Sequence, residues 1–164
     1  MRVFFIFIIL FILSGCVSTH ESSNDLSQTV DEYFRVYSQR NDFESLMSFY
    51  SNEAHFEDII YGNHLKNKAE IRNFLAWDKG EFKVLEGENT LTITSQVVGE
   101  TTAVTEGFFN EFSYDGQKLG PWLFVIVHEF NTHNKIIKQT DWINYTPRTN
   151  FLGGKNMNDE LIHK

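Results

Sequence analysis

The fold is decided by the segment FYSNEAHFEDIIYGNHLKNKAEIRNF, which occupies residues 49–74. Within it, AHFEDIIYGNH is centred on the dipeptide Tyr61-Gly62, and this pattern predicts a short pair of strands joined by a turn. The part that follows predicts a helix over about residues 67–77. The inward-facing apolar residues of this helix are Ile71, Phe74 and Leu75. A strand pair joined to a helix is therefore expected near the middle of the chain.

Two further helices are predicted upstream of this segment. Apolar residues recur at helical spacing in the first of them, at Leu26, Val30, Phe34 and Tyr37. Asp25 is available as its N-cap, and Asn41-Asp42 ends it. Asp42 can then cap a second, short helix. The apolar face of that helix consists of Leu46, Met47, Phe49 and Tyr50.

From residue 89 onward the pattern changes to strands. The β-rich segments that follow one another between turns are LTITSQVV, AVTEGFFNEF, WLFVIVHEF and KIIKQTDWINY. Three helices followed by a four-stranded antiparallel meander predict an α+β domain. We expect the three N-terminal helices to pack on one face of a strongly curved antiparallel sheet, with a cone-shaped cavity between helices and sheet.

The N-terminus has the layout of a secretory signal peptide over residues 1–15. Arg2 is followed by an apolar run at residues 3–13, which is too short for the roughly 20 residues of a membrane-spanning helix. The run ends in Leu-Ser-Gly-Cys, which resembles the bacterial lipobox and implies that Cys16 is acylated. The alternative is an ordinary signal peptide with an incidental cysteine. Cys16 is the sole cysteine, so no disulfide can form within the chain.

The remaining sequence predicts one domain with polar flanks. We expect residues 16–25 to be a lipidated cysteine and a flexible tether, residues 26–146 to be the folded domain, and residues 147–164 to be a poorly ordered tail. The formal net charge of the chain is −8, which disfavours nucleic acid as a partner because such binding rests on Lys and Arg. Membrane attachment would come from the acyl chains at Cys16.

The order of motifs resembles the nuclear transport factor 2-like superfamily, which includes SnoaL-type polyketide cyclases, ketosteroid isomerases and limonene epoxide hydrolases. The matching features are a helix that ends in an aromatic pair, an aspartate before a turn, and a Lys-x-x-Ile-x-x-Phe pattern. In this chain they are Phe49-Tyr50, Asp58, and Lys68, Ile71 and Phe74. The segment HEFNTHNKIIKQTDWIN also resembles the last hairpin of these proteins. The resemblance spans about residues 26–145 and implies a cone-shaped α+β fold.

By this resemblance, Asp58 falls where ketosteroid isomerases keep the carboxylate that shuttles a proton. Apolar surroundings would raise its pKa toward that of a useful general base. The alternative is that Asp58 orders the turn at Tyr61-Gly62. Phe34 and Ile126 stand where those isomerases have the tyrosine and the acid of the oxyanion hole, which disfavours steroid-type isomerisation. His128 could donate a hydrogen bond in place of that acid, or it is a satisfied structural histidine.

This chain keeps one of the catalytic residues that the epoxide hydrolases use. Asp141, within Gln139-Thr140-Asp141-Trp142, matches the acid in their last strand. Gly107 and Phe109 stand where those enzymes carry an arginine and an aspartate. Epoxide hydrolysis is therefore disfavoured as well.

The resemblance also implies which side chains face the cone. The candidate catalytic residues are Asp58, His128 and Asp141. The candidate ligand-binding residues are Phe34, Tyr37, Phe109, Glu111, Trp122, Phe124, Ile126 and Gln139. The alternative is that the aromatic residues simply fill the core. The histidines show no metal-binding spacing, so we expect neither a metal site nor a cofactor.

Three functions follow from these features. The first is a lipoprotein whose cone binds a small apolar molecule, and the second is a proton-transfer enzyme that uses Asp58. The third is a non-catalytic envelope module that forms a homodimer or docks a partner through the outer sheet face, with Val125, Val127 and Trp142. We favour ligand binding over catalysis because this chain lacks most of the catalytic residues of each enzyme subfamily. Val17, rather than an aspartate, follows Cys16, which suggests the outer membrane, facing the periplasm, if the organism has one.

Overall fold

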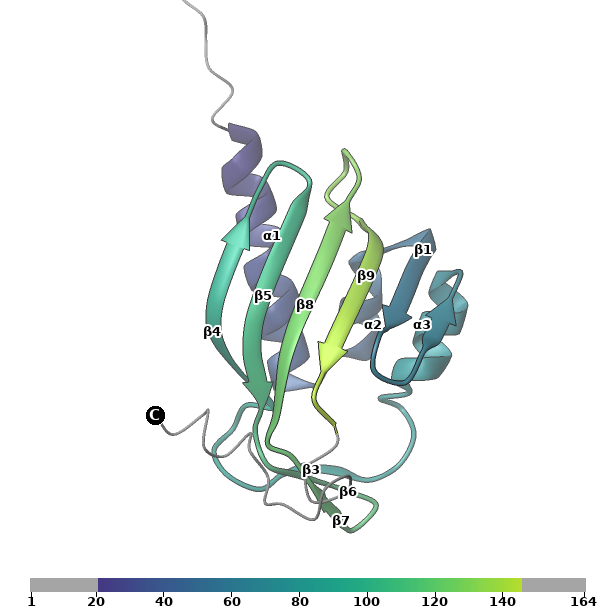
Figure 1. The fold of residues 1–164 in the computed structure, drawn as a ribbon, viewed down its shortest axis with the longest axis vertical. Coiled ribbons are helices and arrows are strands. Elements are labelled where there is room, and N and C mark those ends of the chain that lie inside the picture. Colours follow the sequence, from purple (N-terminus) through teal and green to yellow (C-terminus); the bar gives the residue numbers. More distant parts are fainter. Residues whose placement is uncertain (1–20, 146–164) are drawn as a thin grey trace, which may run out of the picture.

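Helix α1 (Glu21–Gln39) lies along one face of a curved six-stranded sheet in the computed structural model, which describes residues 21–145 (Figure 1). The strand order in this sheet is β2-β1-β9-β8-β5-β4. The bounds of these strands are Tyr50–Asp58 for β1, Asn63–Leu65 for β2, Leu91–Val98 for β4, Thr102–Phe109 for β5, Trp122–Phe130 for β8 and Ile136–Ile143 for β9. The predicted α+β class is confirmed.

The two shorter helices are fixed by their N-caps. Helix α2 (Phe43–Ser48) is capped as predicted by Asp42, whose Oδ1 accepts a hydrogen bond from the backbone N–H of Ser45 at 2.9 Å. Helix α3 (Lys68–Leu75) has Asn67 as its cap, and the Asn67 Oδ1 accepts from the backbone N–H of Glu70 at 2.9 Å. Such caps satisfy backbone donors that have no partner within the helix.

The helix boundaries correct two expectations. Helix α1 begins at Glu21, so Asp25 lies inside it and is not its N-cap. The short helix α2 ends before Phe49, and Tyr50 is already the first residue of β1. Helix α3 follows the β1–β2 hairpin, in the predicted order. The hairpin itself lies on either side of Tyr61-Gly62, as predicted.

The sheet is mixed rather than antiparallel, because β1 pairs with β9 in parallel. The other long strands, β4, β5, β8 and β9, form the predicted antiparallel meander. A second, three-stranded sheet that the sequence did not predict has the order β3-β6-β7. Its strands are Phe82–Val84, Phe112–Tyr114 and Gln117–Leu119. It lies below the ends of β5 and β8 in Figure 1.

A buried core joins α1 to the concave side of the large sheet. The apolar residues predicted for the first helix, Leu26, Val30, Phe34 and Tyr37, are all buried. A register irregularity between Glu129 and Phe130 turns Ile136 inward and leaves Ile137 38% exposed, although simple alternation placed Ile137 on the inner face. The predicted signal peptide, Cys16 and the tail at residues 147–164 lie outside the described residues. Within residues 21–145, no helix has the length and apolar character of a membrane span.

Candidate functional site

A cavity of about 270 Å³ lies between the end of α1, α3, the small sheet and the inner ends of β8 and β9. Most of its lining is aromatic. Its charged residues are Arg40 and Asp141. Four residues of the predicted site line it: Tyr37, Phe109, Trp122 and Asp141. The predicted cone is thus a real space at one end of the domain, where a small apolar molecule would meet ring faces and one carboxyl group.

Ring packing keeps this lining in place. The ring of Phe109 contacts those of Tyr37 and Trp122 edge to face, with centroids 6.0 Å apart in both pairs. On the other side of the lining, Trp122 meets Tyr145 edge to face at 5.2 Å. Such pairs stabilise a fold by roughly 0.5–1.5 kcal/mol each beyond their buried area. The lining is therefore held by the rings themselves.

Asp141 is the only acid among the described residues that line the cavity. Burial raises its pKa, a hydrogen bond that its Oδ1 accepts from Gln139 Nε2 at 2.8 Å opposes that rise, and the charge of Asp58 adds to it. The resulting pKa is about 7. Because this value lies near neutral pH, the Asp141 carboxyl can both accept and donate a proton there.

Asp58 lies beside Asp141 but is not among the residues that line the cavity. Its Oδ1 accepts hydrogen bonds from the backbone N–H groups of Ile60 at 2.9 Å and Tyr61 at 3.2 Å. Its Oδ2 is buried. This geometry is that of a turn-ordering aspartate, the alternative open from the sequence.

Gln139 connects Asp141 to a buried polar network. Its Oε1 lies within hydrogen-bond distance of the hydroxyl groups of Tyr33 and Tyr50, which also lie 2.8 Å from each other, and 3.1 Å from His128 Nε2. Burial lowers the pKa of His128 to about 4, so the ring is neutral at pH 7, and Nε2 carries the proton because the amide oxygen can only accept. The network therefore fixes the orientation of the Gln139 amide, which donates to Asp141.

The remaining predicted residues lie elsewhere. Phe34, Phe124 and Ile126 are buried in the core, and His128 and Gln139 lie in the polar network rather than in the cavity lining. Glu111 is not at the cavity either. It forms an ion pair with Lys118 at 2.7 Å, because the chain leaves β5 at Phe109 and the alternation of faces ends there.

The sequence reasoning did not identify several residues of the site. Tyr33 lies three residues after Val30 on the buried face of α1, and its helical spacing could have indicated it. Arg40, Trp77 and Tyr145 lie in connections outside the helices and strands, where no periodic signal exists.

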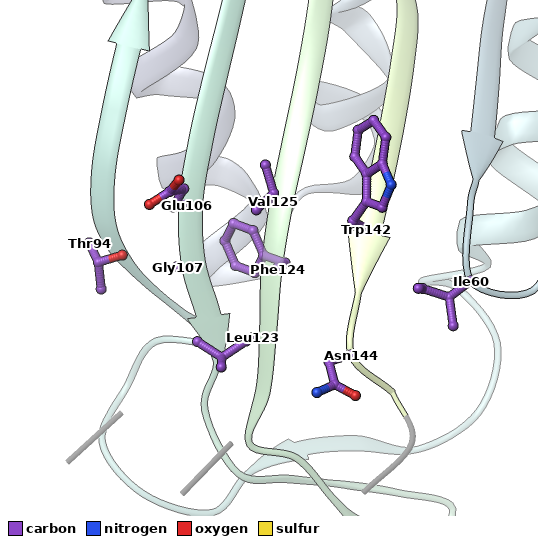
Figure 2. Close-up of a pocket in the computed structure, with 9 residues that line it drawn as sticks. All are labelled: Ile60, Thr94, Glu106, Gly107, Leu123, Phe124, Val125, Trp142 and Asn144. Carbon is purple, nitrogen blue, oxygen red and sulfur yellow. The ribbon is translucent and has the colours of Figure 1, made fainter. Parts of the chain in front are cut away.

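A larger hollow of about 440 Å³ lies on the opposite, outer face of the sheet. In Figure 2 the side chains of Thr94, Glu106, Val125 and Trp142 project from β4, β5, β8 and β9 on the side away from the helix. Glu106 is the only ionisable residue among those that line it. The carboxyl group at this hollow is exposed, whereas Asp141 of the interior cavity is buried, so the interior cavity is the better candidate site. Within residues 21–145, no cluster of His, Cys, Asp or Glu has a metal-binding arrangement.

Solved structures share this architecture. A candidate SnoaL-like polyketide cyclase from Shewanella putrefaciens CN-32 superposes with a TM-score of 0.60 at 16% sequence identity, covering 85% of this chain and 98% of that protein. An LEH-like epoxide hydrolase from M. tuberculosis gives 0.59 at 12% identity, covering 74% and 84%. An NTF-2 like protein from Burkholderia xenovorans LB400 gives 0.57 at 13%, covering 76% and 87%.

The sequence itself matches no protein-family model and no protein of curated function. At these levels of identity, the structural likeness establishes the fold and not the activity. It agrees with the resemblance seen in the order of sequence motifs. The chain has the nuclear transport factor 2-like fold.

Proposed function

We propose that the interior cavity binds a small apolar molecule that presents one hydrogen-bonding group to Asp141. The observation that carries this proposal is an aromatic lining that contains a single acid, with a pKa of about 7. A mainly apolar pocket with few, well-placed polar groups is the usual composition of a small-molecule site. The volume of about 270 Å³ favours a ligand of one or two rings, or an aliphatic chain of similar size.

The acid in this site suits either a ketone or a hydroxyl group on the ligand. A protonated Asp141 donates a hydrogen bond to a carbonyl oxygen, and an ionised Asp141 accepts one from a hydroxyl. Two of the superposed proteins are named for polyketide cyclisation and epoxide hydrolysis. Polyketides and epoxides are therefore the first ligand classes to try, followed by steroids, terpenoids and fatty acids.

Proton transfer is the second candidate function, and the pKa of Asp141 is the observation that favours it. A general base works best when its pKa lies near the operating pH. In this proposal Asp141, rather than Asp58, exchanges the proton with the ligand. Asp58 acts as a positioning residue that raises the pKa of Asp141 by its charge. His128 acts through Gln139, which it helps to orient.

The experiment for ligand binding is a thermal unfolding screen on the full chain in detergent micelles. Phe109→Trp enlarges a side chain of the cavity lining, and Ile137→Trp makes a comparable enlargement at an exposed outer position. We expect a ligand to raise the Tm of the wild type and of Ile137→Trp in a saturable way and not to raise that of Phe109→Trp. A ligand at 100 times its Kd stabilises the folded state by about 2.7 kcal/mol. Equal stabilisation of all three proteins would contradict a site in the cavity.

We also propose that the protein is anchored in the cell envelope through acyl chains on Cys16, facing the periplasm if the organism has an outer membrane. The Leu-Ser-Gly-Cys motif is the support for this proposal. Labelled palmitate fed to an expressing bacterium should enter the wild-type chain and not the Cys16→Ser chain. Incorporation into both chains, or into neither, would contradict acylation at this residue.

A homodimer formed through the outer sheet face is proposed on the exposed apolar residues of that face. Val97 is 67% exposed and Trp142 is 42% exposed, and Trp142 borders the outer hollow. Exposed apolar area of this kind is typical of interaction surfaces. In this arrangement the interior cavity would stay open, because it lies on the other side of the sheet.

A further inference from the structure

Arg40 is a cation at the cavity that has no counter-charge among residues 21–145. It follows the end of α1, where its backbone N–H donates to the Val36 carbonyl at 3.0 Å. Its φ of 49° is in the left-handed region, which is uncommon for a residue with a side chain. This conformation directs the chain out of the helix and places Arg40 in the cavity lining.

Aromatic rings hold the guanidinium group in position. Its Cζ lies 4.2 Å from the centroid of the Phe82 ring and 4.9 Å from that of Trp77. Cation–π contacts of this kind attract the charge to a ring face and satisfy none of the five N–H donors of an arginine. The donors of Arg40 therefore remain available to a further partner.

No partner for these donors is found within the described chain. Between residues 21 and 145, no carboxylate lies within ion-pair distance of Arg40, and its side chain makes no hydrogen bond. The other arginines of that range differ, since Arg35 pairs with Glu32 and Arg72 pairs with Glu44 at 2.8 Å. Partial burial of a cation is unfavourable unless an opposite charge or acceptor meets it.

The two charged groups of the cavity act on a common neighbour. The charge of Asp141 raises the pKa of the Tyr37 hydroxyl, after the larger effect of burial, and the charge of Arg40 lowers it. Tyr37 is therefore within electrostatic range of both groups. Arg40, Tyr37 and Asp141 all line the cavity, so a molecule bound there has both charged groups in its surroundings.

We propose that the ligand is a small apolar carboxylate whose anionic end is bound by the Arg40 guanidinium group. The planar fork of an arginine matches the two oxygens of a carboxylate. The apolar body would lie against Tyr37, Phe109 and Trp122, away from that end. This inference rests on the proposed function, because it assigns a chemical class to the molecule in the same cavity.

The test compares an acid with its neutral amide of the same shape. The binding of 2-naphthoate and 2-naphthamide is measured by calorimetry at pH 7.5 on the full chain in detergent micelles. Phe109→Trp in the same micelles corrects for partition into the detergent. We expect 2-naphthoate to bind about 10-fold more tightly or better, since a hydrogen bond to a charged group is stronger than one to a neutral group.

Variants then assign the preference to Arg40. Arg40→Gln should bind the acid and the amide equally, and Arg40→Lys should keep part of the preference. Arg35→Gln, which removes an exposed arginine of α1, should retain all of it. The wild-type comparison decides the question even if Arg40→Gln does not fold.

The outcomes separate this inference from the proposed function. Equal binding of acid and amide by the wild type overturns the assignment to carboxylates and leaves ligand binding in the cavity intact. The same conclusion follows if neutral molecules bind in the thermal screen and neither naphthalene probe binds: the assignment to carboxylates fails, and ligand binding in the cavity stands. If no molecule of either experiment binds, the proposed function and this inference fail together.

Discussion

Asp58 and Asp141 are direct partners in the parallel pairing of β1 with β9, and both side chains are buried. The backbone N–H of Ile59 continues this pairing by donating to the Asp141 carbonyl at 3.0 Å. Asp58 accepts hydrogen bonds from the hairpin turn, whereas Asp141 lines the cavity.

The buried charge of Asp141 should lower stability at alkaline pH. The pKa is about 7 in the folded chain against 3.8 for the free side chain, so the folded state binds this proton more tightly. The resulting stabilisation is fully present below about pH 3.8 and is lost as the pH rises through 7. Asp141→Asn, which can still accept a hydrogen bond from Gln139, should raise the free energy of unfolding at pH 8 by on the order of 2–4 kcal/mol.

Urea unfolding at pH 8 and pH 4 checks this prediction, with a much smaller gain expected at pH 4. Asp78→Asn is the control, because Asp78 is exposed and makes only a 3.6 Å ion pair with Arg72. That change should alter stability by less than about 1 kcal/mol at either pH. A loss of stability in Asp141→Asn at pH 8 would mean that the ionised carboxylate is favourable where it lies.

His128 should act in the opposite direction on the acid side. Its pKa is about 4 in the folded chain against 6.5 for the free side chain, so the unfolded state takes up the proton first. Stability from this group is therefore lost as the pH falls from 6.5 toward 4. Relative to wild type, His128→Gln should show a flatter loss of stability over that range in urea unfolding. His133→Gln, at an exposed loop position, should follow the wild-type profile.

Gln139 should be among the most sensitive polar positions of the domain. Gln139→Leu removes the acceptor of Tyr33, Tyr50 and His128 and the donor to Asp141 at once. Each buried polar group left without a partner costs about 1–3 kcal/mol, so we expect a total loss of at least about 3 kcal/mol in urea unfolding. Gln117→Leu, at an exposed position of β7, should remain within about 0.5 kcal/mol of wild type. Comparable losses in both variants would contradict a central role of the Gln139 amide.

The dimer proposal predicts that a substitution on the outer sheet face lowers the mass of the particle in solution and leaves the cavity unchanged. Trp142→Glu places a charge on the outer face, where burial in an interface would be strongly unfavourable. Sedimentation at micromolar concentration should show a wild-type dimer and a Trp142→Glu monomer. The melting temperature of the wild type should also rise with protein concentration. A monomeric wild type would count against the interface and leave the cavity proposals untouched.

The elements with local signals could be predicted from the sequence. Helical spacing from Leu26 to Tyr37 indicated α1, and alternation from Trp122 to His128 indicated the inner face of β8. The parallel pairing of β1 with β9 and the contact of β3 with β6 could not, because each joins segments far apart in the chain. Short strands such as Phe82–Val84 also carry too few residues to show a period.

For the site, the sequence indicated the acid of the cavity and part of its aromatic lining. Asp141, Phe109 and Trp122 could be predicted because they lie on strands in which every second residue faces inward. Asp58 was predicted either as a proton carrier or as a residue that orders the turn, and in the folded chain one of its oxygens accepts hydrogen bonds from that turn. Which of two adjacent carboxyls reaches a cavity depends on tertiary packing, and no spacing rule contains that information.

The three tryptophans of the chain allow the most direct test of ligand binding in the cavity. Trp77 and Trp122 line the cavity, whereas Trp142 borders the outer hollow on the other side of the sheet. Indole ¹⁵N–¹H NMR signals, assigned with single Trp→Phe variants, would be followed while a ligand from the screen is added. Binding in the cavity predicts saturable shifts of the Trp77 and Trp122 signals and an unchanged Trp142 signal. Shifts confined to Trp142 would contradict it, because they would place the ligand on the outer face.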